Sequence, residues 1–350
     1  MKRTHKQNGI TLVALVITIV ILVILAGISI SALTNQGLFT KAQNAKDLTE
    51  EKTAEENETL TNYLEQMDII TGTLKIKSVA PSTETTHTAT AITFTWDELS
   101  TIAKMISNNS SITNDTAEVQ VETNLGAKTL GVGDTATVDS KTVRILGFNH
   151  DTLTTATAYG ETTATGKAGI SFEYVDFIDV DGNGTIKAGM NSTNTNTGGW
   201  GASALRSTLN STTYNNLSIK GKIKQVNKEF IQTYNDANSI DENNPSTDYL
   251  WLLSCGEIWA NGYNGGVTTR GYAIATEGSQ YKYYKSTLGS TTYSSSTAIT
   301  KKPNTSSATS WWLRSPRYGD GDRFCDVDSD GSCYNNYASG SRGVAPGFCI

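Results

Sequence analysis

Clusters of basic residues are absent from this chain beyond its first six positions, apart from the pair Lys301 and Lys302. The formal net charge is −6 at pH 7, so the chain offers no patch that would neutralise a phosphate backbone. Nucleic acid is therefore excluded as a partner. Proline is also rare, with 5 residues in 350, while Thr, Ser, Asn and Gly are abundant. This polar composition of low charge is typical of secreted β-rich domains.

Catalytic signatures are missing as well. Of the 3 histidines, His5 lies in a short leader and His87 in a Thr-rich segment, which leaves His150 for acid–base chemistry. No G-x-S-x-G, H-E-x-x-H or Walker A pattern occurs, so the sequence predicts a protein that is not an enzyme. The 4 cysteines are too few for a disulfide scaffold, and without a C-x-x-C motif a structural zinc site is not expected. Cys325 and Cys333 are placed to meet across a hairpin, but the sequence leaves the disulfide state of all the cysteines open.

A long apolar run follows a basic leader at the N-terminus. Lys2, Arg3 and Lys6 precede Gly9, and residues 10–33 are uncharged and mostly apolar. At ~1.5 Å per residue this run predicts a helix of roughly 36 Å, enough to cross a hydrocarbon core of about 30 Å. The one-sided positive charge predicts a cytoplasmic N-terminus and places the rest of the chain outside the membrane.

The charged, glycine-free segment that follows, residues 41–67, predicts that the helix continues outward. Residues 68–94 are rich in threonine without sustained periodicity and are expected to form a linker. The sequence pattern changes after residue 94. Residues 96–106 carry apolar side chains at helical spacing, and Thr95 is a candidate cap for this helix. We therefore expect a folded head over residues 95–350, with short antiparallel strands and two or more helices. The predicted fold class is α+β, with a long N-terminal helix as a membrane or filament spine.

The order of basic leader, Gly9 and apolar helix resembles the class III leader of type IV prepilins. The resemblance implies that a prepilin peptidase cuts between Gly9 and Ile10, with residues 1–9 as the leader and 10–67 as a transmembrane, pilin-like helix. Other pilins are then expected as partners. Ala14 stands where this family usually has a glutamate that pairs with a neighbouring subunit, so entry into a filament stays open. The alternative is a plain single-span anchor.

Three segments of the head, residues 190–210, 248–259 and 311–350, are similar in order to bacterial and phage C-type lectin-like domains used as variable ligand-binding proteins. The resemblance implies a C-type lectin-like head at the cell surface whose C-terminal face binds a protein or glycan. Some relatives are diversified by retroelements, which leave codons that never encode Lys, Gln, Glu, Met or Trp. Residues 317–350 contain none of these five. A turn-rich hairpin also favours Gly, Asp, Asn and Ser, so the pattern supports diversification without deciding it.

The closing segment separates into expected scaffold and expected surface. Trp311 and Trp312 should lie in the core, and Arg314 would need an acidic partner, for which Glu257 is the candidate. The polar and aromatic residues of the variable stretch are the expected ligand-binding face. These are Tyr318, Asp320, Asp322, Arg323, Asp326, Asp328, Ser332, Tyr334, Asn335, Asn336 and Tyr337.

One Asp-rich loop carries a calcium signal. Asp179, Asp181 and Asn183 follow the first half of an EF-hand loop, but Met190 stands where the bidentate glutamate belongs. The alternatives are a calcium site and a solvated turn, and no other cofactor is expected. Residues 326–330 have a similar look and are better explained as an Asp-Gly hairpin turn.

Three functions remain open at this point. The leading hypothesis is a surface-displayed or pilus-associated binding protein. The second is a structural minor pilin that binds no ligand. The third is a fold-related, copper-dependent oxidase of the formylglycine-generating type, in which Cys325 and Cys333 would imitate a pair of copper-binding cysteines.

Overall fold

A computed structural model describes residues 12–35, 43–53, 74–78, 87–232, 245–260, 277–289, 295–303, 307–317 and 320–350. The chain divides into two compact units, Met1–Met67 and Asp68–Ile350. The second unit is the head.

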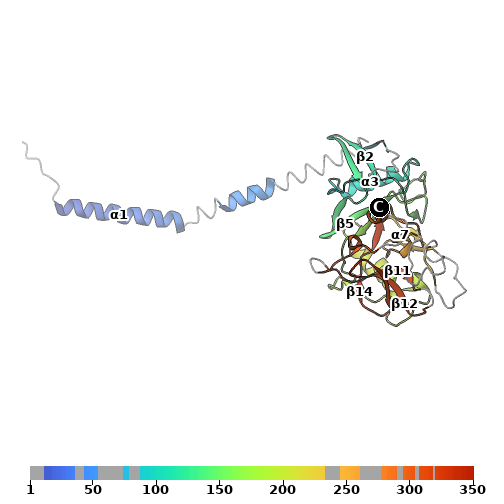
Figure 1. The fold of residues 1–350 in the computed structure, drawn as a ribbon. Coiled ribbons are helices and arrows are strands. Elements are labelled where there is room, and N and C mark those ends of the chain that lie inside the picture. The colour runs from blue at the N-terminus through green and yellow to red at the C-terminus, as the bar shows by residue number, and fades with distance from the viewer. Residues whose placement is uncertain are drawn as a thin grey trace, which may run out of the picture. The chain divides into compact units, whose positions relative to one another are not determined.

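The described residues of the N-terminal unit form two helical stretches. Helix α1 spans Leu12–Asn35, and residues 43–53 form the second stretch (Figure 1). Asn35 is a weak helix former and Gly37 follows it closely in the sequence, a combination typical of helix ends. The prediction of one continuous helix over residues 10–67 is therefore wrong.

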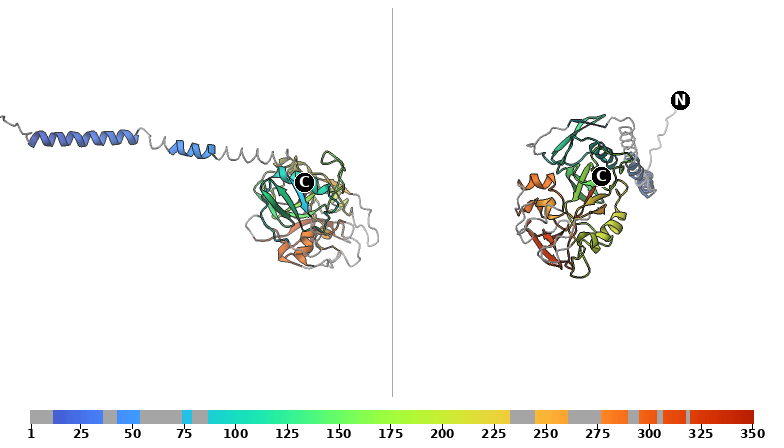
Figure 2. Two further views of the ribbon diagram at one scale, coloured as in Figure 1. Left: turned by 90° about the horizontal axis from the view of Figure 1, so that it is seen from above. Right: turned by 90° about the vertical axis from the view of Figure 1, so that its right-hand side faces the viewer.

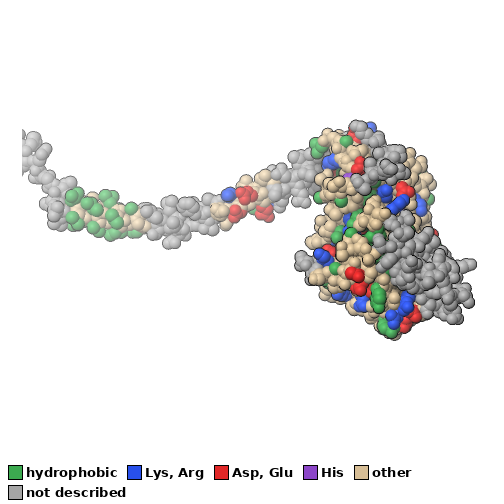
Figure 3. Space-filling view, viewed as in Figure 1, with side chains coloured by type: hydrophobic (Ala, Val, Ile, Leu, Met, Phe, Trp, Pro, Cys, Tyr) green, Lys and Arg blue, Asp and Glu red, His purple; other side chains and the backbone are tan. Residues whose placement is uncertain are grey.

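The described side chains of α1, at residues 14–28, are mostly apolar and all exposed (Figure 3). Contrary to the span expected over residues 10–33, no helix in the described part of the chain is long and apolar enough to cross a membrane.

Four sheets build most of the head over its described residues. The central four-stranded sheet has the order β15-β7-β5-β4, formed by Gly347–Cys349, Ile170–Tyr174, Lys141–Phe148 and Thr135–Val138. A five-stranded sheet has the order β13-β12-β11-β14-β8, formed by Cys333–Tyr337, Arg323–Val327, Trp311–Pro316, Arg342–Gly343 and Lys187–Ala188. This sheet is mixed, because β11 and β14 run parallel.

Two three-stranded sheets complete the set. One has the order β1-β2-β3, from Lys75–Ser78, Glu118–Thr123 and Gly126–Gly131, and the other has the order β10-β9-β6, from Ser246–Asp248, Val226–Lys228 and Thr152–Leu153. Strand β1 falls inside residues 68–94, where a linker was expected, and it pairs with β2.

The helices in the described part of the head are short. They are α3 Trp96–Ser107, α4 Gly199–Ala202, α5 Ala204–Thr208, the π-helical turn η1 Leu209–Thr213, α6 Tyr214–Asn216, α7 Cys255–Trp259, α8 Lys282–Leu288 and the 3-10 turn η3 Thr297–Ile299. Helix α3 begins where the sequence predicted, since Thr95 and Glu98 form a capping box at its start. The described fold is nevertheless β-rich with mixed sheets, so the predicted α+β class with a long N-terminal helix is wrong.

The core lies around the central sheet. Figures 1 and 2 show β5 and the C-terminal strand between an end of the head that carries β2 and α3 and an end that carries β11, β12 and β14. The rings of Phe172 and Phe348 stack in the central sheet with centroids 5.3 Å apart. Trp311 and Trp312 are fully buried, as the sequence predicted. The second end of the head is thus held rigidly by large side chains.

Candidate functional site

The β12–β13 hairpin forms one edge of the five-stranded sheet, with β13 outermost. Tyr334 and Tyr337 on β13 are 57% and 43% exposed. Among the described residues of the head, Leu125 is the one other large apolar side chain exposed to this degree. Exposed tyrosines on a strand backed by a packed core are a common feature of binding surfaces.

The two tyrosines point to opposite faces of the hairpin. Tyr334 pairs in register with Asp326, and Tyr337 pairs with Arg323 three positions further along β13. Successive side chains of a strand alternate between faces, so an odd spacing separates them. The guanidinium of Arg323 lies 4.2 Å from the centroid of the Tyr337 ring and donates a hydrogen bond of 3.3 Å to Asn335 Oδ1. Tyr337 is therefore held in place by Arg323, whereas Tyr334 stands further into solvent.

Asp326 was expected on the binding face, but it is buried. Strand β12 lies between β11 and β13, and its residues are covered on both faces, which removes the exposed side that simple alternation would provide. Arg342 Nε donates a hydrogen bond of 3.1 Å to Asp326 Oδ2. Burial raises the pKa of Asp326 to about 6 despite this partner. The assignment of Asp326 to the ligand-binding face is wrong.

The rest of the expected face is only partly open. Its half-buried members are Asp320, Asp322, Arg323, Asp328, Ser332, Asn335 and Asn336. Asp328 Oδ1 accepts a hydrogen bond of 2.7 Å from Ser310 Oγ, so this carboxylate ties the hairpin turn to the residue before β11. Tyr318 lies outside the described residues, as do the expected processing residues Gly9 and Ile10.

The structure brings Arg314 and Glu257 together. Arg314 Nη1 donates to Glu257 Oε2 at 2.5 Å and Nη2 donates to Oε1 at 3.0 Å, and both residues are buried. Glu257 also closes a capping box with Ser254 at the start of α7, which fixes its position. Because Glu257 accepts hydrogen bonds from two nitrogens of Arg314, the pair ties β11 to α7 and supports the scaffold beneath the hairpin.

A charged cavity of about 490 Å³ opens beside this pair. Its wall includes His150, Asp151, Lys228, Glu257 and Arg314. Lys228 Nζ lies 2.6 Å from Asp151 Oδ1 and 2.5 Å from Glu257 Oε1. Burial alone would raise the pKa of Asp151 and Glu257, but the neighbouring cations hold both pKa values below their ordinary range. The cavity wall thus alternates fixed positive and negative charges.

His150 is the one candidate that sequence reasoning had left for acid–base chemistry in the head. Its ring stacks on Tyr281 with centroids 3.9 Å apart, and burial lowers its pKa. The imidazole is therefore neutral near pH 7. Arg314 and Glu257 were predicted as a structural pair, whereas Asp151 and Lys228 were not predicted as members of the cavity wall.

The calcium candidate forms a closed turn. Asp179 Oδ1 accepts from the N–H groups of Asp181 and Gly182 at 3.1 and 2.9 Å, and Oδ2 accepts from Gly184 at 2.7 Å. Asp181 Oδ2 accepts from the Thr185 hydroxyl at 2.8 Å. These carboxylates are engaged by the loop itself, and Asn183 is exposed.

The described residues that are grouped closely enough to hold a metal ion are three buried thiols, those of Cys255, Cys325 and Cys333. Two of them lie on the β12–β13 hairpin and the third begins α7.

Comparison with known proteins gives one match. Residues 171–350 match the family model described as Domain of unknown function (DUF6273), a range that contains most of β7, the hairpin and the cavity residues Lys228, Glu257 and Arg314. No curated protein and no solved structure matches the chain.

Proposed function

The chain belongs to the family described as Domain of unknown function (DUF6273), and we propose that it is a ligand-binding protein that meets a protein or glycan through the outer strand β13. The observation that carries this proposal is the exposure of Tyr334 and Tyr337 on one strand. Tyrosine supplies a large, rigid contact area with few rotatable bonds, and it dominates many binding surfaces.

The surroundings of the tyrosines support the same role. Arg323 stacks on Tyr337, and Asn335 and Asn336 separate the two tyrosines in the sequence of β13, so each face of this edge strand carries one tyrosine and one asparagine. Aromatic rings flanked by amide groups and a guanidinium suit a glycan or a polar protein surface. Either ligand can stack on the rings and form hydrogen bonds with the amides and the guanidinium. The buried scaffold below leaves these side chains free to vary.

The proposed place of action is the cell surface, in a pilus or outside one. The support is the basic leader before Gly9 and the polar, weakly charged composition of the head. Cleavage by a prepilin peptidase and retroelement diversification of residues 317–350 belong to the same proposal.

The test uses tyrosine variants of the full chain. Tyr334→Ala, Tyr337→Ala and the double variant are compared with Leu125→Ala, the matched change of an exposed apolar residue elsewhere on the head. Binding to glycan arrays and to intact cells is measured beside thermal melts. We expect the double variant to bind at least ~30-fold more weakly, as for the loss of a 2 kcal/mol hot spot, and Leu125→Ala to bind as the wild type does. A double variant that keeps wild-type binding overturns the proposal.

A second candidate function is the binding of a small polar molecule in the charged cavity. Its volume of about 490 Å³ falls within the range of small-ligand sites. Lys167 lines this cavity and donates to Thr152 Oγ1 at 2.8 Å. A thermal-shift screen with sugars and amino acids, run on the wild type and on Lys167→Met, tests this candidate. A ligand of the cavity should stabilise the wild type more than the variant.

A further inference from the structure

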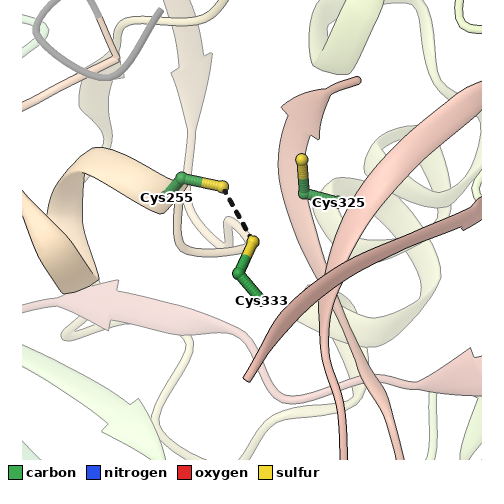
Figure 4. A group of neighbouring side chains, drawn as sticks. All are labelled: Cys255, Cys325 and Cys333. Carbon is green, nitrogen blue, oxygen red and sulfur yellow. Dashed lines mark hydrogen bonds between the residues drawn. The ribbon is translucent and has the colours of Figure 1, made fainter. Parts of the chain in front are cut away.

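The inner side of the hairpin carries an arrangement that differs from that of ordinary core cysteines. Cys325 of β12 lies opposite Asn335 of β13, and Val327 of β12 lies opposite Cys333 of β13. Alternate residues of a strand share a face, so both thiols lie on one face of the hairpin. Cys255 is the first residue of α7, and Figure 4 shows its sulfur facing that of Cys333, with the Cys325 sulfur close by. Segments far apart in the sequence thus deliver three soft ligands to one point.

The spacing of the sulfurs fits one shared ion. All three Sγ atoms lie within 4.8 Å of one another, and Cys255 Sγ and Cys333 Sγ are 3.8 Å apart. Three sulfurs that each bind one ion at ~2.3 Å would stand about 3.8–4.0 Å from one another. A disulfide would instead need about 2.05 Å between two sulfurs and would leave the third alone.

From this geometry we propose that Cys255, Cys325 and Cys333 form a three-coordinate site for a single Cu(I) ion. Thiolate sulfur selects soft ions, chiefly Cu(I) and Zn(II). Structural zinc sites use four protein ligands, and no fourth Cys, His, Asp or Glu completes this group among the described residues. The three-sulfur set therefore favours Cu(I).

The fourth cysteine shows that burial alone does not produce this cluster. Cys349 is also fully buried, but its Sγ lies 3.3 Å from Asp151 Oδ2 and 3.3 Å from Ser171 Oγ. It is the natural control, since it has the same chemistry and burial outside the three-thiol group.

The experiment is an anaerobic titration of the reduced full chain with Cu(I) against bicinchoninate, a chromophoric chelator. We expect the wild type and Cys349→Ser to retain one Cu(I) per chain, and Cys255→Ser, Cys325→Ser and Cys333→Ser each to lose it to the chelator. X-ray absorption of the loaded wild type should show three sulfur neighbours, and its melting temperature should rise with Cu(I). These two measurements need no variant, so a variant that fails to fold leaves the test intact.

Three results would overturn the assignment. A reduced wild type that retains no Cu(I) removes the site, and retention that survives all three single substitutions places the ion elsewhere. Displacement of bound Cu(I) by equimolar Zn(II) would show that the geometry serves a different metal.

Discussion

Arg314 and Glu257 meet as a bidentate pair between strand β11 and helix α7, with both side chains withdrawn from solvent. Each guanidinium nitrogen that faces the carboxylate contacts a different oxygen, and Lys228 approaches the same carboxylate from the cavity side. Removing one partner of such a pair lowers the stability of the fold, because an unpaired charge would remain in the core.

Replacing Arg314 by Met should destabilise the head by about 3–5 kcal/mol, the usual range when one partner of a buried pair is removed. Urea denaturation of the purified protein measures the change. The control is Lys104→Ala, which removes a surface ion pair with Glu161 at 3.2 Å and should change stability by at most about 1 kcal/mol. Equal effects of the two changes would contradict the role assigned to the buried pair.

The stability of the head should fall as pH rises from about 4.5 through 8 because of Glu277. Burial raises the pKa of Glu277 to about 8 in the folded state, above its ordinary value of 4.5. In this window the folded state binds more protons than the unfolded state, so the free energy of unfolding decreases with increasing pH. Denaturation at several pH values should show that Glu277→Gln, which mimics the protonated form, gains stability relative to the wild type as pH increases. A constant difference across the window would refute the assignment.

Substitutions of scaffold residues and of surface residues should differ in their effect on stability. Trp311→Ala removes a fully buried ring and should cost ~3–5 kcal/mol of stability through lost packing and a cavity. Tyr334→Ala should stay within about 0.5 kcal/mol of the wild type, because the ring is exposed. Thermal melts of both variants check the contrast. A tyrosine variant that unfolds as readily as the tryptophan variant would mean that β13 belongs to the core.

The mature chain should begin at Ile10 in cells that carry an active prepilin peptidase. The basic leader ends at Gly9 directly before the apolar run, which is the order expected from the resemblance to type IV prepilins. Mass spectrometry of the purified N-terminus gives the answer. Gly9→Val should block cleavage, and an unprocessed wild-type chain would leave the leader without this role.

Local patterns in the sequence predicted local structure well. Thr95 caps α3 as expected, because a cap depends on residues that are close in the sequence, and Trp311 and Trp312 of β11 are buried as expected. Helix length was overestimated, since glycine-free composition says where a helix is permitted and does not say where it stops.

The candidate site was predictable only in part. The exposed tyrosines stand in a segment recognised from its residue types, but Asp326 is buried because its strand is covered on both faces of the sheet. The charged cavity and the third thiol of the cysteine cluster could not be foreseen, because they join residues such as Asp151 and Lys228, or Cys255 and Cys333, across long sequence separations. Such contacts are set by the packing of the whole head.

The central sheet has a kinetic consequence. Strand β7 pairs with β15, so Phe172 lies opposite Phe348, and β15 also bridges Trp251 through Gly347. Pairing β7 with β15 closes the long stretch of chain between them, which lowers chain entropy before most of the apolar surface is buried. Proteins dominated by such distant pairings fold slowly. We expect β15 to dock late, so that newly made chains pass through a state with an open central sheet. Crowding by other unfolded chains at that stage would favour misassembly, which makes the rate of strand closure a determinant of how much protein reaches its native form.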